Sequence, residues 1–198
     1  MMDSMSLFTL ALTLFLIMNP LGNMKHFLSL LRELKAPRHR FVVAREMVFA
    51  LIIMFIFSLL GERIAWAFSF DETTIYLASG AILFLAAIKI IFPKEEHIPH
   101  IHGEEPFLIP IAIPIIASPA LLATIMLYSQ SEILVWPMVL SIFIAWTLSI
   151  VLLLGSRRIL RLIGPNGLIA IERIMGIVLV LLAVQRFMEG ILLFVAHK

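Results

Sequence analysis

Six apolar stretches constrain this chain most, because each is long enough to cross a lipid bilayer as a helix. A helical crossing takes about 20 apolar residues. The sequence is 62% hydrophobic and 14% charged, whereas soluble domains are roughly 45–50% apolar and about 25% charged. The stretches predict an all-α, polytopic membrane protein of six transmembrane helices, with no room for a second folded domain. They lie at about 6–31, 41–61, 74–92, 107–128, 133–155 and 168–193.

Basic residues are distributed unevenly between these stretches. The second intervening loop has only Arg63 and the fourth has none, whereas the first, third and fifth are rich in Lys and Arg. The positive-inside rule therefore places the three basic loops in the cytoplasm and both termini outside. The start of the chain lacks a basic segment and a clear cleavage site, so we expect the first stretch to be retained. The basic loop residues are Arg32, Lys35, Arg38, Arg40, Lys89, Lys94, Arg157, Arg158 and Arg161.

Two of the stretches contain helix-breaking residues. Proline cannot donate a backbone hydrogen bond, and it directs the preceding residue towards extended geometry, which we expect for Asn19 and Ser118. Freed backbone groups at membrane depth persist only where they are buried in protein or line a wet cavity. Interrupted segments in corresponding halves of a chain indicate a transporter's binding site. The first break comprises Asn19, Pro20, Leu21, Gly22 and Asn23, and the second comprises Ser118, Pro119 and Ala120.

Each broken stretch is expected to form two half-helices that meet near the middle of the membrane. The N-terminus of a half-helix favours a carboxylate, while C-terminal carbonyls favour an ammonium group or a small cation. Together they would suit a zwitterion, with hydrogen bonds from Asn19, Asn23 and Ser118. The structural alternative is an ordinary proline kink.

The two halves of the chain are similar in spacing. Gly80 follows Pro20 by 60 residues, and Gly176 follows Pro119 by 57. Three crossings followed by three of opposite orientation predict an inverted repeat, which is a common transporter plan. Gly80 and Gly176 would allow close helix approach or expose backbone to a solute, so both are candidate binding residues. The predicted repeats span about 1–93 and 106–198, joined by a cytoplasmic loop at about 94–105.

Several polar residues lie inside apolar stretches and are functional candidates for that reason. Gln185 is the deepest and is a candidate cavity residue. Arg186 and Glu189 are three positions apart and could pair on one helix face. Glu46, Glu172 and Glu189 could carry a coupling ion, although each is close enough to a helix end to reach the interface instead.

Few other sequence features indicate chemistry. His97, His100 and His102 lie among glutamates and could bind a metal or respond to pH, but a solvated linker is the favoured interpretation. The chain has no cysteine, and nucleotide-binding and hydrolase motifs are missing. We therefore predict no enzyme activity, no cofactor, no metal site and no nucleic-acid partner. The basic loops suit membrane orientation and anionic headgroups.

Taken together, these residues resemble the MarC family, also called the neutral amino-acid transporter family, which includes SnatA-type proteins. The resemblance covers essentially the whole chain. It implies six spans in inverted repeats, a bacterial inner-membrane location, and ion-coupled transport of small neutral amino acids such as glycine or alanine. The matching motifs are Asn19-Pro20-Leu21-Gly22-Asn23, Ser79-Gly80-Ala81-Ile82-Leu83-Phe84, the segment from Pro110 to Thr124, and Arg173-Ile174-Met175-Gly176 continuing through Gln185 to Gly190.

The chain departs from the family pattern at both breaks and in the third stretch. Gly-Pro-Gly is usual where Ser118-Pro119-Ala120 stands, an arginine is usual near Tyr76, and an apolar-Pro pair is usual at Met24-Lys25.

From the breaks, the topology and the resemblance together, we expect a secondary transporter that uses H⁺ or Na⁺ and rocks around the two breaks. The alternatives are an exporter of another small solute, or a membrane protein with a metal- or pH-sensing histidine loop and no transport role. Oligomeric state is not predicted.

Overall fold

The computed structural model describes residues 7–24, 28, 36–92, 117–130 and 135–196. Within these ranges the chain is helix and turn, with no strand, so the predicted all-α class is confirmed for the described residues. These segments carry apolar side chains on every face, a pattern typical of membrane or fully buried helices and not of amphipathic surface helices. The helices are α1 (Leu7–Met18), α3 (Ala36–Ala67), α4 (Glu72–Ile91), α5 (Pro119–Gln130) and α6 (Val135–Ala196).

Three of the described helices are long and apolar enough to cross a membrane. They contain the segments Phe41–Ala67, Glu72–Ile91 and Trp136–Ala196. Helices α1 and α5 are apolar but shorter, as expected for halves of interrupted spans. The membrane class is therefore supported, while six crossings, the inverted repeat and the boundaries of its two halves stay predictions.

Helix α6 differs from the sequence prediction, which placed a loop between about 155 and 168. The chain stays helical through this region and changes direction at Gly164, whose φ is 71° and ψ 173°. Arginine and leucine are good helix formers, so the charged stretch extends the helix instead of ending it. Glycine tolerates the positive φ, and Pro165 suits the first turn of the following helix. We call residues 135–163 the first arm and 165–196 the second arm.

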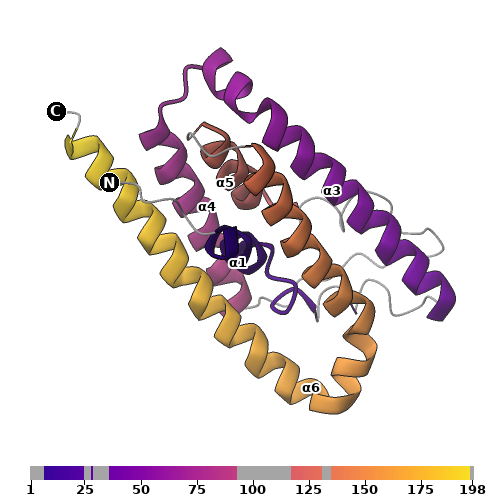
Figure 1. Ribbon diagram of the computed structural model, residues 1–198. Helices are drawn as coiled ribbons and strands as arrows, with labels where there is room; N and C mark the ends of the chain where they lie inside the picture. The colour runs from indigo at the N-terminus through magenta and orange to yellow at the C-terminus, as the bar shows by residue number, and fades with distance from the viewer. Residues whose placement is uncertain (1–6, 25–27, 29–35, 93–116, 131–134, 197–198) are drawn as a thin grey trace.

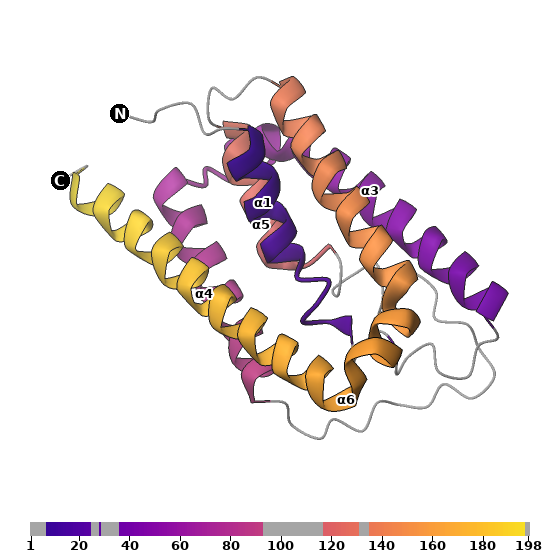
Figure 2. The same ribbon diagram turned by 60° about the horizontal axis from the view of Figure 1, so that its bottom comes forward.

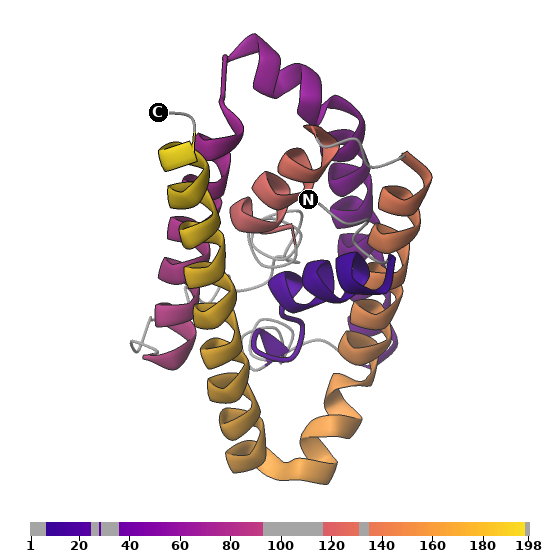
Figure 3. The ribbon, with the colours of Figure 1, turned by 60° about the vertical axis from the view of Figure 1, so that its left-hand side comes forward.

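The two arms of α6 form a V, and α1 and α5 lie between them (Figure 1). The second arm runs antiparallel beside α4, whereas the first arm lies beside α3 (Figure 2). Turning the molecule shows the same arrangement, with α1 and α5 inside the V (Figure 3). The two helices that end or begin at a break are therefore the innermost described elements.

Hydrogen bonds to main-chain atoms and one sulfur contact join the first arm to its neighbours. Trp146 Nε1 donates to the carbonyl of Met47 on α3 at 2.7 Å. Ser141 Oγ donates to the carbonyl of Leu7 at 3.3 Å, and Ser149 Oγ lies 3.7 Å from Met18 Sδ. These contacts hold both ends of α1 against the first arm, so the first break begins beside Ser149.

The second arm packs against α4 through small residues. A Cβ at Gly80 would lie 3.0 Å from the carbonyl oxygen of Ala183 and from the backbone nitrogen of Phe187. A Cβ at Gly176 would lie 2.7 Å from Ile91 Cγ1. Close backbone approach of this kind is typical of membrane helix pairs, which gain little from the hydrophobic effect and depend on van der Waals packing.

Candidate functional site

The first break is a tight buried turn that follows α1. Asn19 adopts a φ of 47°, so its backbone is left-handed and not extended as the following proline had led us to expect. Asparagine tolerates this conformation because its short side chain can hydrogen-bond to the local backbone. Asn19 Oδ1 accepts a hydrogen bond from the backbone N–H of Gly22 at 3.1 Å. The turn is therefore closed by the asparagine side chain.

The amide of Asn19 is only partly satisfied. Asn19 is 1% exposed, and its Nδ2 has no hydrogen-bond partner among the described residues. Gly22 permits this arrangement, because any Cβ there would collide with the Asn19 side chain. Asn23 Nδ2 lies 3.5 Å from the carbonyl of Met18, the last residue of α1. The first break thus combines a C-terminal carbonyl that already accepts a hydrogen bond with a buried donor that has no partner among the described residues.

The second break is more regular. Helix α5 begins at Pro119, and Ser118 Oγ accepts a hydrogen bond from the N–H of Leu121 at 3.2 Å. The carbonyl of Ser118 accepts from the N–H of Leu122 at 3.0 Å. This is an N-cap, in which a side-chain oxygen satisfies one of the free donors of the first turn. The second break therefore functions locally as a well-formed helix start.

The residues around the two breaks belong to one hydrophobic core. Met18 precedes the first break, while Ala117 and Ala120 flank the pair Ser118-Pro119, and all three are buried in the same cluster. The C-terminus of α1 and the N-terminus of α5 therefore both contribute to the main core, which also contains residues of α3, α4 and α6. One supplies carbonyl oxygens and the other supplies N–H groups, which have opposite preferences for ligand charge.

The other predicted binding residues lie elsewhere. Gly80 and Gly176 lie at the contact between α4 and the second arm. Gln185 is exposed, and its Nε2 donates to Glu189 Oε1 at 3.0 Å. The predicted pairing of Arg186 with Glu189 is wrong, because Arg186 Nη2 donates instead to Tyr128 Oη at 2.7 Å. Gly80 and Gly176 thus pack against Ala183 and Ile90 of the same core, whereas Gln185 lies outside it.

Glu46 is buried more deeply than its position near a helix end suggested. It is 0% exposed, and Arg45 Nη2 lies 2.8 Å from its Oε1. Its Oε2 has no hydrogen-bond partner among the described residues. The adjacent residue Met47 contacts the first arm through the Trp146 hydrogen bond. A buried carboxylate with one free oxygen is a candidate for binding a proton or a small cation.

The histidine loop and the residues just after the first break lie outside the described residues. His97, His100 and His102 are among them, as are Lys25 and His26. Within the ranges that the structure does describe, no group of three His, Asp or Glu side chains is arranged to hold a metal ion.

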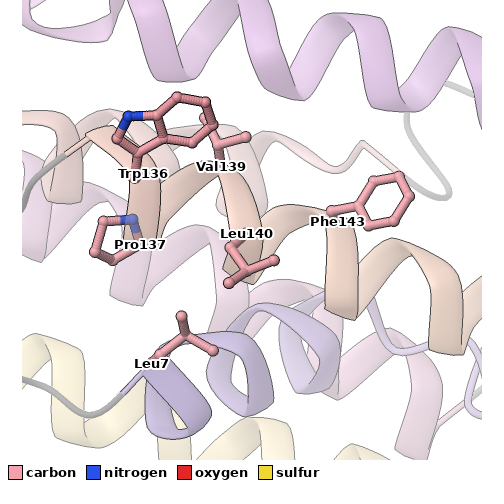
Figure 4. Close-up of a pocket in the computed structure, with 6 residues that line it drawn as sticks. All are labelled: Leu7, Trp136, Pro137, Val139, Leu140 and Phe143. Carbon is pink, nitrogen blue, oxygen red and sulfur yellow. The ribbon is translucent and has the colours of Figure 1, made fainter.

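An apolar groove of about 350 Å³ lies at the start of the first arm, against the beginning of α1 (Figure 4). Trp136 is 81% exposed there. The groove adjoins the end of α1 opposite the first break, and its lining carries no charged side chain. Such a surface suits contact with lipid better than binding of a polar solute. Its lining residues are Leu7, Trp136, Pro137, Val139, Leu140 and Phe143.

Comparison with known proteins identifies relatives along nearly the whole chain. A UPF0056 membrane protein of Buchnera aphidicola, BU449, is 45% identical over 180 residues, covering 90% of this chain and 92% of the relative. The UPF0056 inner membrane protein YhgN of Escherichia coli is 42% identical over 186 residues, covering 91% and 93%. A UPF0056 membrane protein of Chlamydia muridarum is 30% identical over 189 residues, covering 94% and 93%. No solved structure matches the chain.

The sequence profile described as MarC family integral membrane protein matches residues 4–195. This confirms the resemblance that the break motifs indicated. The printed names of these relatives describe membrane proteins and state no substrate or reaction. On the extent of the profile match and the identity to its relatives, the chain belongs to the MarC family of integral membrane proteins.

Proposed function

We propose that this protein is a secondary transporter of small neutral amino acids such as glycine and alanine, located in a bacterial inner membrane. The observation that carries the proposal is the buried Asn19 amide at the first break, which is 1% exposed and has a donor without a partner among the described residues. An unsatisfied buried donor costs free energy, about 1–3 kcal/mol, unless a ligand or water completes it. A transported solute is the ligand that the position favours.

The charge pattern at the two breaks supports a zwitterionic solute. The carbonyl end of α1 favours an ammonium group, and the N–H end of α5 favours a carboxylate. The residues flanking both ends share one buried core. Ala117 and Ala120 beside the second break are closely packed, at 0% and 2% exposed, so the solute's own side chain has little space there, which favours glycine or alanine over larger amino acids.

Ion coupling is part of the proposal. Glu46 is a fully buried carboxylate, and one of its oxygens has no partner among the described residues. A buried carboxylate of this kind can take up and release a proton or hold a small cation. Alternating access would then involve movement of the two halves around the breaks. The proposed location is supported by the relative in Escherichia coli, which is named as an inner membrane protein.

The test is uptake of labelled glycine into proteoliposomes, with a proton or sodium gradient applied separately. Asn19→Gly removes the amide, including its hydrogen bond to Gly22, but keeps a residue that accepts a positive φ, so the left-handed backbone at position 19 stays accessible. We expect uptake to fall by at least about tenfold, the equivalent of about 1.4 kcal/mol in binding. Asn166→Gly is the matched control, because Asn166 is exposed and lies outside both breaks.

Two results would contradict the proposal. One is wild-type protein that takes up none of the small neutral amino acids under either gradient. The other is an Asn19→Gly protein that folds normally and takes up glycine as fast as the Asn166→Gly control. A family member that carries another solute would give the first result, and a plain proline kink would give the second.

A further inference from the structure

A buried arginine lies between two tyrosines on the second arm of α6, away from both breaks. Arg186 is 5% exposed. Its Nη2 donates to Tyr128 Oη at 2.7 Å, and its guanidinium carbon lies 4.9 Å from the Tyr128 ring centre and 5.7 Å from the Tyr76 ring centre. We call Arg186, Tyr76 and Tyr128 the arginine cluster. It joins α4, α5 and the second arm.

The positive charge of the arginine cluster has no directly paired carboxylate among the described residues, although the charge of Glu189 is close enough to act on both tyrosines. No carboxylate within the described ranges forms an ion pair with Arg186, and its Nη1 has no hydrogen-bond partner there. Glu189 lies one turn further along the arm, but it accepts its hydrogen bond from Gln185. Aromatic faces and a neutral phenol attract a guanidinium without neutralising it. A buried, uncompensated charge is strongly unfavourable, so an anion that reached it would bind well.

The planar shape of the Arg186 guanidinium determines which kind of anion fits it. A guanidinium is planar and presents its N–H donors as a fork that matches a carboxylate. Nη1, at one end of this fork, is buried without a hydrogen-bond partner among the described residues, while Nη2 is held by Tyr128, which fixes the plane. The cluster is therefore preorganised for a small planar acid group.

We propose that the arginine cluster is a second binding site, specific for the carboxylate group of a small solute. It lies at the far end of α5 from Pro119, roughly 14 Å along the helix axis from the second break. Tyr76 is only partly buried and lies in the first turns of α4, so a small acid can approach past it. The site goes beyond the proposed function, because it requires neither an amino group nor the breaks.

Fluorine NMR gives a direct test. The chain has only two tyrosines, Tyr76 and Tyr128, and both belong to the cluster. Full-length protein labelled with fluorotyrosine and reconstituted in lipid nanodiscs should show two resonances, and both should shift saturably when sodium propionate is added. Propionamide and sodium chloride at equal concentration should leave them in place. A spectrum that does not respond to propionate, or responds only to inorganic phosphate, overturns the proposal.

Variants identify the residue responsible. Arg186→Gln should weaken propionate binding at least about thirtyfold, because the buried charge is lost. Arg173→Gln is the matched control, since Arg173 is exposed on the same arm, and it should bind like wild type. Glu189→Gln removes a nearby negative charge and should strengthen binding about twofold or more. Equal affinity in Arg186→Gln and Arg173→Gln overturns the proposal.

Tyr128→Phe carries the test if Arg186→Gln does not fold. It removes the hydroxyl that holds the guanidinium but keeps the ring and the charge. Its single remaining resonance, from Tyr76, should show propionate binding weakened about tenfold, and unchanged affinity overturns the proposal. Propionate lacks an amino group, so its titration is independent of glycine uptake. Propionate binding without glycine uptake would contradict only the proposed transport function. Glycine uptake without propionate binding would contradict only the proposal of this second site.

Discussion

The two breaks interrupt their helices with the same residue, proline, yet they satisfy their polar groups differently. At the second break, Ser118 caps α5 through both its hydroxyl and its carbonyl. At the first, Asn19 uses one side-chain atom to close the turn and leaves the other without a partner among the described residues. At the second break the Ser118 oxygens accept hydrogen bonds from the N–H groups of the first turn of α5. At the first break the Asn19 oxygen accepts a hydrogen bond, while the Asn19 NH₂ group is left without a partner among the described residues. Capacity for a ligand is therefore greater at the first break.

The largest effect on this comparison should come from Gly22→Ala. The added methyl group would collide with the Asn19 side chain, so the turn must open or the asparagine must move. Overpacking of this kind costs about 1–3 kcal/mol, and we expect a lower apparent melting temperature in detergent together with loss of uptake. Gly155→Ala is the matched control, because a Cβ there meets only Ile159 Cδ1 at 3.9 Å. Equal melting temperatures for the two variants would show that the turn is not tightly packed.

A smaller effect should separate Asn19→Ala from Asn19→Gly. Both variants lose the amide, but alanine must adopt the φ of 47° that asparagine has here. A left-handed residue with a Cβ costs roughly 1–2 kcal/mol. The alanine variant should therefore melt at the lower temperature, while both should transport equally poorly. Equal melting temperatures for Asn19→Ala and Asn19→Gly would mean that the backbone at position 19 has left the left-handed region in the variants.

The smallest effect should come from Ser118→Ala at the second break. Loss of an N-cap costs about 1 kcal/mol, and the helix start would otherwise persist because Pro119 is suited to its first turn. We expect a small fall in melting temperature and uptake that is much closer to wild type than that of Asn19→Gly. Ser118→Thr should recover the melting temperature, since threonine can also cap. A Ser118→Ala protein as inactive as Asn19→Gly would mean that the two breaks contribute equally to binding.

Local chemistry made the helices and the breaks predictable from sequence. Apolar length predicted α4 closely but only the middle of α3, which begins at Ala36 and ends at Ala67. The prolines located the end of α1 and the start of α5. The path of α6 was not predictable in the same way, because Arg157, Arg158 and Arg161 suggested a loop although they are compatible with a helix. The kink at Gly164 depends on one residue's dihedral angle, which glycine permits and does not require.

Long-range partners were the main thing that sequence reasoning missed. Arg186 and Tyr128 are 58 positions apart, and Glu189 was the only partner within reach along the same helix. The left-handed Asn19 was missed for a related reason, because the side-chain bond to Gly22 outweighs the usual effect of a following proline. A useful signal was present in the composition, since the chain has only two tyrosines and both lie in apolar helices, α4 and α5.

Gly164 has a mechanical consequence for the whole bundle. The first arm is attached to α1 and α3, whereas the second is attached to α4, and within α6 a single non-helical residue joins them. The second arm is a lever roughly 45 Å long at about 1.5 Å per residue. A rotation of about 5° at its base would displace its tip by about 4 Å. The displacement in any such motion is therefore set by the length of the second arm, which moves as one helix, and not by the flexibility of a connecting loop.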